Sequence, residues 1–403
     1  MPINLKSFLT AALASTVLAS GVAQAQSPQP IQIGLIAPTS GIYARPGQVM
    51  KMGAEMAIED VNKAGGIACL GGAPLELVTI DSGDTVEKAT NSAQRMVADF
   101  PGLVGATGAY LSSFTLAVSE VTERADLPLL TLSYSDLITS RGFKNIFQTS
   151  ATAGVQAQIA LPIILDLAEQ QTGTRPKTVA VITDNTAASL ASVDRMKKGL
   201  LKDVGLDLTF EQVFTPPLAD ATSLVQQVRQ QKPDLLFFLP TVISDSKLIL
   251  EKMKEFRVKT PVISFGIAIA EPEVLNTMQA DLLEGVMSAV ANWGSKGQED
   301  LIKRLNEKYG EPWMTQNAIS TYGDIWLFKE ALDKSCSRDR KALGEALRTL
   351  NAGPAKYFPG GTLSFDDKGH REGASLTIIQ WQSGVPVTVY PDDLALAKPV
   401  WPK

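Results

Sequence analysis

Residues 102–135 read GLVGATGAYLSSFTLAVSEVTERADLPLLTLSYS, and this stretch decides the fold. A short apolar run leads through small residues to Ser112. Apolar residues at helical spacing follow, and a second apolar run, 127–132, ends just before Ser133 and Ser135. The stretch therefore predicts a strand, a turn, a helix and a second strand, with hydroxyl side chains after both strands.

The position of these hydroxyls indicates a ligand site. In a parallel α/β sheet the carboxyl ends of the strands and the N-termini of the helices face one crevice, where ligands bind. We expect Ser112 at or near a helix N-cap, where free backbone N–H groups and the positive end of the helix dipole suit a carboxylate. A lone serine in such a place also serves as an ordinary cap or turn residue, and both interpretations stay open at this point.

The N-terminus has the pattern of a secretory signal peptide, residues 1–25. Lys6 precedes an apolar stretch, and Ala23-Gln24-Ala25 forms an A-x-A cleavage site. No later run approaches the roughly 20 apolar residues that a membrane span requires. The sequence therefore predicts a periplasmic protein, cleaved after Ala25, that does not insert into the membrane.

Composition limits the classes of function. The chain has 403 residues, 45% hydrophobic and 20% charged, which is enough for two domains with substantial cores. Its net charge of −5, without a basic cluster, argues against nucleic acid and against an anionic membrane surface. The two cysteines, Cys69 and Cys336, form a possible disulfide in an oxidising compartment, although spacing does not show that they meet.

The order of elements predicts a doubly wound sheet and then a second one. Strands at 31–36 and 75–80, and helices that follow them, give the alternation β, α, β, α, β, α, β through residue 132. After residue 150 the pattern restarts as a second α/β lobe. Its predicted strands cover 178–183, 207–213, 235–239 and 261–265, and the predicted helices cover 190–204, 221–231 and 244–256. Later helices are predicted at 298–309, 316–334 and 340–350, and β-hairpin structure at 361–365, 375–382 and 385–389.

Several separated motifs give a resemblance to a known family. They are IQIGLIAPTSGIYARPGQVMKMGAEMAIEDVNKAGGI at 31–67, VGATGAYLSSFT at 104–115, LPLLTLSYSDLITSRGFKNIFQT at 127–149 and GGTLSFDDKGHREG at 360–373. In this order they resemble the branched-chain amino-acid binding proteins of ABC importers, the type I periplasmic family.

The resemblance implies an architecture and a role. It implies two doubly wound α/β lobes joined by a three-crossover hinge, with residues 26–149 and 290–362 in lobe 1, and 150–289 and 363–403 in lobe 2. It also implies a monomer that closes on a small solute and delivers it to a membrane permease. No enzyme chemistry, cofactor or metal is expected, since the sequence lacks a nucleophile motif, a metal-ligand set and a dinucleotide fingerprint.

Carried over residue by residue, the resemblance also implies a binding site. Ser112 matches the serine that takes the ligand carboxylate. Arg45, in the first strand–helix loop, could pair with a carboxylate or be a solvated loop residue. The remaining candidates are Tyr43 in the same loop, Ser133 and Ser135 in the second binding loop, and Tyr110 and Tyr134 beside these hydroxyls.

Three departures from the family pattern concern the ligand. Ala188 stands where relatives carry Tyr-Gly, Thr241 where an aromatic residue is usual, and Phe265 where an acidic residue holds the ligand ammonium. A buried ammonium needs a charged or well-bonded partner. We therefore expect a carboxylate ligand: a branched-chain or related amino acid, or alternatively an aromatic or other non-amino organic acid. A ligand-sensing receptor subunit is the alternative role, and an exported enzyme is disfavoured.

Overall fold

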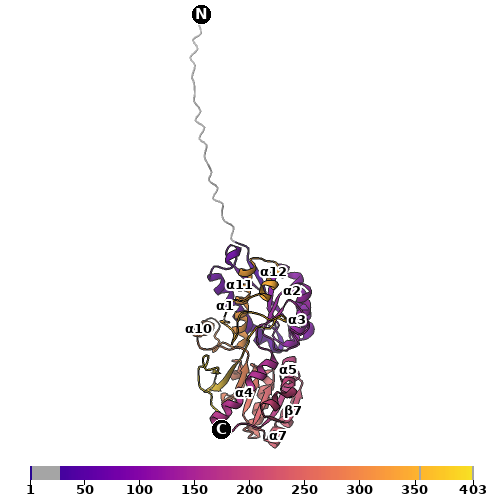
Figure 1. Ribbon diagram of the computed structural model, residues 1–403, viewed down its shortest axis with the longest axis vertical. Coiled ribbons are helices and arrows are strands. Elements are labelled where there is room, and N and C mark those ends of the chain that lie inside the picture. Colours follow the sequence, from indigo (N-terminus) through magenta and orange to yellow (C-terminus); the bar gives the residue numbers. More distant parts are fainter. Residues whose placement is uncertain (2–27, 354, 402–403) are drawn as a thin grey trace.

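The computed structural model describes Met1 and residues 28–353 and 355–401. The predicted signal peptide, apart from Met1, lies outside the described residues. The chain forms two bodies that follow one another along the long axis, each built around one β-sheet (Figure 1). We call the body around the five-stranded sheet the first unit and the body around the seven-stranded sheet the second unit. Across the described part of the chain, no helix is long and apolar enough to cross a membrane.

The first unit has a parallel sheet. Most residues of its strands are buried because helices cover both faces, which explains their nearly continuous apolar sequences. In spatial order the strands are β2 (Leu75–Asp81), β1 (Ile31–Ala37), β3 (Leu103–Gly108), β4 (Leu129–Thr131) and β5 (Ile146–Gln148).

Helices from two distant parts of the chain cover this sheet. Figure 1 shows the orange α11 and α12 packed in the same body as the indigo and purple helices. One core combines side chains of α1 (Ala44–Lys63), α10 (Glu299–Tyr309), α11 (Gln316–Ser335) and α12 (Arg340–Arg348). The core on the opposite face includes α2 (Val86–Asp99) and α3 (Ser112–Arg124).

The second unit has a mixed sheet. Its spatial order is β12 (Val385–Tyr390), β11 (Thr377–Gln382), β10 (Met287–Val290), β9 (Val262–Phe265), β8 (Leu235–Leu239), β6 (Thr178–Asp184) and β7 (Asp207–Phe214). The strands from β10 to β7 pair in parallel, and β11 and β12 add an antiparallel hairpin at one edge. This hairpin agrees with the sequence prediction for 375–389.

Two cores also enclose this sheet. Side chains of α4 (Ala153–Thr172) and α5 (Ala187–Arg195) form the first, and those of α7 (Thr222–Gln231), α8 (Ile243–Glu255) and α9 (Val274–Thr277) help to form the second. The prediction of one continuous helix over residues 190–204 is wrong. The backbone leaves helical geometry at Lys198 and Gly199, where φ is 124° at the glycine, and only the short α6 (Leu201–Asp203) follows.

Three segments connect the units. They lie between β5 and α4, between β10 and α10, and after Arg371. The third passage comes later than residue 362, the boundary expected from the sequence. Phe365 packs against Phe147 in the core of the first unit, with ring centroids 5.1 Å apart, and a β-bridge joins Gln148 to His370. The strand predicted at 361–365 is reduced to one bridge, from Phe365 to Arg371.

A buried arginine ties two of these segments together. The Arg371 side chain donates hydrogen bonds to the carbonyl oxygens of Thr149, at 2.9 Å, Pro359, at 2.8 Å, and Gly360, at 2.6 Å. Burial lowers the pKa of Arg371 to about 10. Because its donors satisfy carbonyls from the first passage and from residues 359–360, Arg371 fixes the start of the third passage beside the first.

Candidate functional site

A small cavity lies between the two units. Its volume is about 70 Å³, and it is lined by the N-terminal turns of α3 and α5, the loops after β4 and β8, and the end of β9. We call it the inner pocket. Seven of the sequence-predicted residues line it: Tyr110, Ser112, Ser133, Tyr134, Ala188, Thr241 and Phe265.

Ser112 is the first residue of α3 and connects two strand ends. Its Oγ accepts hydrogen bonds from the backbone N–H groups of Tyr134 and Ser135, each at 3.1 Å, and the residue is 4% exposed. Because the oxygen acts as acceptor in both bonds, the hydroxyl hydrogen stays available as a donor. The N-cap is Leu111, which supplies no side-chain cap, so the first N–H groups of α3 keep their capacity for a ligand.

The turn after β3 has a strained backbone. Gly108, Ala109 and Tyr110 all have positive φ, at 123°, 62° and 32°. Two hydroxyls hold the turn: Thr131 Oγ1 donates to the Gly108 carbonyl at 3.0 Å, and Ser133 Oγ donates to the Tyr110 carbonyl at 2.9 Å. A non-glycine residue in this region of φ is uncommon and persists where its surroundings fix it. The Ser133 hydroxyl therefore holds the turn that carries Tyr110.

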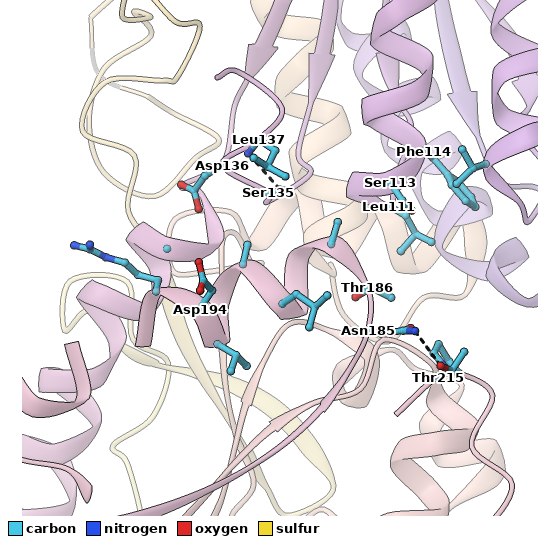
Figure 2. Close-up of a pocket in the computed structure, with 18 of the residues that line it drawn as sticks. Leu111, Ser113, Phe114, Ser135, Asp136, Leu137, Asn185, Thr186, Asp194 and Thr215 are labelled. Carbon is cyan, nitrogen blue, oxygen red and sulfur yellow. Dashed lines mark hydrogen bonds between the residues drawn. The ribbon is translucent and has the colours of Figure 1, made fainter. Parts of the chain in front are cut away.

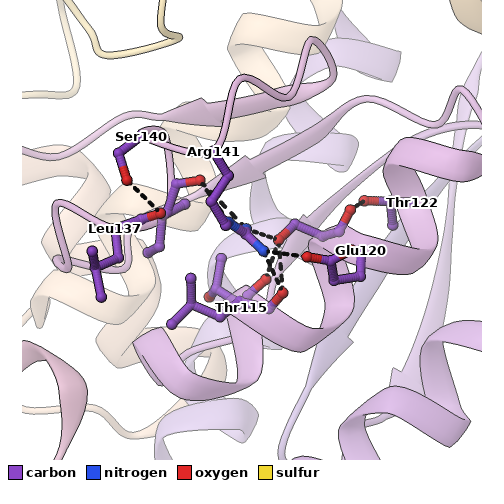
Figure 3. A network of polar contacts seen from close by, with 9 residues as sticks. Thr115, Glu120, Thr122, Leu137, Ser140 and Arg141 are labelled. Atoms are coloured by element: carbon purple, nitrogen blue, oxygen red, sulfur yellow. Dashed lines mark hydrogen bonds and ion pairs between the residues drawn. The ribbon is translucent and has the colours of Figure 1, made fainter.

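The loop that carries Tyr134 is fixed to α3 by an arginine, shown in Figure 3. The Arg141 guanidinium donates to the Leu116 carbonyl at 3.0 Å and to Ser119 Oγ at 2.5 Å, and it forms an ion pair with Glu120 at 2.9 Å. Since all three partners belong to α3, the loop and the helix N-terminus keep one relative position. This arrangement preorganises the first-unit side of the pocket.

On the second unit, one buried carboxylate organises the pocket. Asp184, fully buried at the end of β6, accepts hydrogen bonds from both the N–H and the hydroxyl of Thr186 and of Thr241, at 2.7 to 3.1 Å. Four donors therefore occupy its oxygens. The N-cap of α5 is Thr186, which makes no side-chain cap, so the first turn of α5 also presents unpaired N–H groups beside the pocket.

The rest of the lining is apolar or hydroxyl-bearing. Phe265 packs edge-to-face on Phe237, with centroids 5.4 Å apart, and Leu132 and Ile267 also line the wall. The Tyr134 hydroxyl is buried without a hydrogen-bond partner, and burial raises the pKa of this phenol. The pocket therefore offers uncharged donors and an apolar surface.

A larger open groove continues from the inner pocket. This outer groove, drawn in Figure 2, has a volume of about 1250 Å³ and shares Leu111, Ser113, Thr186 and Ala187 with the inner pocket. Two predicted site residues, Tyr43 and Ser135, line this groove and not the inner pocket. The Ser135 hydroxyl accepts the Leu137 N–H at 3.3 Å, so it stabilises a turn at the rim.

Arg45 lies outside both cavities. Its guanidinium pairs with both carboxylate oxygens of Glu311 at 2.6 Å and also with Glu273, which belongs to the second unit. The structure thus uses the arginine in an ion-pair cluster between the units. From the sequence, Arg45 was expected either to pair with a ligand carboxylate or to be solvated. In the structure its partners are the two protein carboxylates.

A buried carboxyl group, Glu271, lies near this cluster. It is 1% exposed, its Oε1 accepts a hydrogen bond from Asn317 Nδ2 at 2.9 Å, and its Oε2 has no partner. Burial, followed by the charge of Glu273, raises the pKa of the Glu271 carboxyl to about 8. Its folded form therefore holds a proton at neutral pH.

This carboxyl should make stability depend on pH. A carboxyl whose pKa is raised on folding favours the folded state below its unfolded pKa of 4.5, and that contribution is lost as pH rises to about 8. We expect Glu271→Gln to remove this decrease in stability with rising pH. The free energy of unfolding of the variant, measured relative to wild type, should therefore rise by up to about 1.4 kcal/mol for each pH unit in this window. Urea unfolding at pH 5, 6, 7 and 8 measures the difference, and a pH-independent difference would contradict it.

The two cysteines lie side by side. Cys69, in a short 3₁₀ turn, and Cys336, at the C-terminal end of α11, are both exposed free thiols. The Cys336 thiol lies 3.1 Å from the Cys69 carbonyl oxygen. Desolvation and the neighbouring Cys336 thiol raise the pKa of Cys69 to about 11.

Sequence reasoning missed three residues that shape the inner pocket. Gln156 and Gln316 line it from α4 and α11, and Asp184 anchors its second-unit side. No local motif marks the two glutamines. Asp184 had a signal, because it directly follows a predicted apolar strand at the edge where ligands bind.

The chain is similar in sequence and in fold to known proteins. The chain is 28% identical over 399 residues to the Leu/Ile/Val-binding protein homolog 7 of Brucella melitensis, covering 96% of this chain and 97% of the relative. The fold matches LivJ of Streptococcus pneumoniae, a branched-chain amino acid transporter substrate-binding protein in complex with isoleucine (18% identity, 89% of this chain and 100% of that one, TM-score 0.74). It also matches a fatty acid ABC transporter substrate-binding protein from Thermomonospora curvata (20% identity, 90% and 93% coverage, TM-score 0.74).

These structural likenesses show the type I periplasmic-binding-protein fold that the sequence predicted. A family model described as periplasmic binding protein matches residues 30–386, which span nearly all of the described chain. The protein belongs to the periplasmic binding protein family.

Proposed function

We propose that the protein is the solute-binding component of an ABC importer, working in the periplasm without catalysing a reaction. It captures a small carboxylate ligand between its two units and presents the closed form to a membrane permease. The observation that carries this proposal is the inner pocket, to which both units contribute uncapped helix N-termini and in which Ser112 retains a free donor. The Brucella relative, named a Leu/Ile/Val-binding protein homolog, and the isoleucine complex support the role.

In this proposal the ligand carboxylate accepts the Ser112 hydroxyl and N–H groups of the first turn of α3. The positive end of the α3 dipole stabilises its charge by about 0.3–1 kcal/mol. The first turn of α5 contributes from the second unit, so a bound ligand touches both units at once. Because these contacts are complete only when the units are close, the ligand favours the closed form.

A ligand panel tests the proposal. We expect at least one small carboxylate among leucine, isoleucine, valine, phenylalanine and the corresponding deaminated acids to raise the thermal midpoint of ligand-free protein. The shift should grow as RT ln(1 + [L]/Kd). The matched control is the amide of the same ligand, which keeps its size but lacks the carboxylate. Equal stabilisation by acid and amide, or by neither, would contradict the proposal.

Replacing Ser112 should weaken binding of the ligand found in this panel. Ser112→Ala removes the donor to the ligand and the acceptor of two buried N–H groups, so we expect a loss of about 1–3 kcal/mol in binding free energy. Ser135→Ala is the matched control, since it removes a buried hydroxyl that lies outside the inner pocket, on the loop whose backbone N–H groups Ser112 accepts. Isothermal titration should show nearly unchanged affinity for the control. Equal losses in both variants would mean that the loop, and not Ser112, determines affinity.

A further inference from the structure

The charge of the inner pocket narrows the ligand class. Among the described residues that line it, none is Asp, Glu, Lys, Arg or His, although the pocket lies between two units whose surfaces are rich in charge. Its electrostatic character comes from two helix N-termini: those of α3, with 13 residues, and α5, with 9 residues. Each is uncapped and directs positive dipole charge to the same cavity.

Two buried hydroxyls can donate hydrogen bonds to a ligand in the cavity. Ser112 is 4% exposed, and its oxygen already accepts two N–H groups, so it can only donate to a ligand. The Tyr134 hydroxyl is buried and has no partner among the described residues. A carboxylate accepts such bonds through both of its oxygens, whereas an ammonium group has no acceptor to offer them.

Neither nearby carboxyl group supplies a charge partner for a ligand cation. Asp184 is fully buried, does not line the cavity, and has its oxygens occupied by four donors from Thr186 and Thr241. Glu271 also lies outside the lining, is hydrogen-bonded to Asn317, and is kept protonated at neutral pH by its burial. At the end of β9 the chain places the phenyl ring of Phe265 in the cavity wall.

We infer that the inner pocket selects an organic acid that carries no ammonium group: an aliphatic or aryl carboxylate whose uncharged body lies against Phe265, Leu132 and Ile267. This inference rests on the proposed solute-binding function and specifies its substrate class. A buried ammonium would face two positive helix ends with no carboxylate in the pocket lining to accept its hydrogen bonds, and burial of an unpaired charge is strongly unfavourable. Phe265 is thus the residue that determines specificity at this position.

Paired ligands that differ only in the ammonium group test the inference. We expect 4-methylpentanoate to bind wild-type protein about tenfold or more tightly than leucine, and 3-phenylpropanoate to exceed phenylalanine likewise, because the amino acids bury an unpaired charge. Isothermal titration of refolded, ligand-free protein at pH 7 measures each dissociation constant. Amino acids that bind as tightly as their deaminated partners, or more tightly, would overturn the inference while leaving the solute-binding function intact. If none of the four carboxylates binds, the proposed function fails together with the inference.

A pair of variants at Phe265 tests the role of that residue. Phe265→Glu places a carboxylate at the end of β9, so it should shift the leucine to 4-methylpentanoate affinity ratio towards leucine by about tenfold or more. Phe265→Gln has nearly the same shape without the charge, and its ratio should stay close to wild type. Circular dichroism and the thermal midpoint of each variant establish that it folds. An equal ratio in folded Glu and Gln variants would overturn the assignment of Phe265.

Discussion

Oxidation of the purified protein should join Cys69 to Cys336 and stabilise the first unit. The thiols are neighbours in the structure, and the bond would close a loop with a sequence separation of 267 residues. Loop-closure entropy of this size predicts a stabilisation of about 5.6 kcal/mol, and about 2–4 kcal/mol is typical of measured disulfides. Calorimetry should therefore show a transition several degrees higher in the oxidised protein than after reduction with dithiothreitol.

The oxidation experiment has a chemical requirement and a control. Because the pKa of Cys69 is raised to about 11, little thiolate exists at neutral pH, and spontaneous exchange should be slow. An added disulfide or a metal-catalysed oxidant at pH 8 should drive the reaction, and loss of both free thiols in a thiol assay should follow it. The Cys69→Ser variant should show no shift between oxidising and reducing buffers. Two thiols that persist after oxidation would contradict the prediction.

Arg45→Ala should strongly destabilise the ligand-free protein. The arginine is the cation that Glu311 and Glu273 share, and the Glu311 side chain is only 6% exposed. Removing one partner of a fully buried pair typically lowers the free energy of unfolding by about 3–5 kcal/mol. Arg45 and Glu273 are partly exposed, so we expect a smaller loss of about 2–3 kcal/mol, which arises because the Glu311 charge stays desolvated. Urea unfolding at pH 7 measures the loss.

A second variant separates this role from ligand binding. Arg45→Lys keeps the charge but loses the planar guanidinium that contacts both oxygens of Glu311, so an intermediate loss is expected. In both variants the ligand should still raise the thermal midpoint, since Arg45 lies outside the inner pocket. Unchanged stability of ligand-free Arg45→Ala together with abolished binding would instead place Arg45 at the ligand.

The fold was largely predictable because its signals are local. The apolar run at 235–239 predicted β8 with its observed limits, since strands covered on both faces have continuous apolar sequences. The place of Ser112 at the start of a helix was predicted in the same way, because the order strand, turn, helix places a helix N-terminus at the carboxyl edge of the sheet. The break near Gly199 was not recognised, because apolar spacing continues across it.

The uses of individual side chains were less predictable because their partners are distant in the chain. Arg45 and Glu311 are 266 residues apart, so no local pattern reveals their ion pair. Ser133 was predicted beside the ligand, and it does line the pocket, but its hydroxyl is used by Thr115, Thr131 and the Tyr110 carbonyl. Spacing along the chain locates a side chain on an element, whereas its hydrogen-bond partners depend on the tertiary arrangement.

The discontinuous first unit has a consequence for the order of folding. Its core needs α11 and α12, which are synthesised more than 160 residues after β5, while the parallel strands of the second unit, β6 to β9, lie in one continuous stretch. Domains usually fold as units, beginning at the N-terminus during synthesis. Here the first unit emerges first but cannot complete its core until α11 and α12 have been synthesised. The parallel strands of the second unit can therefore reach their native arrangement before the first unit does.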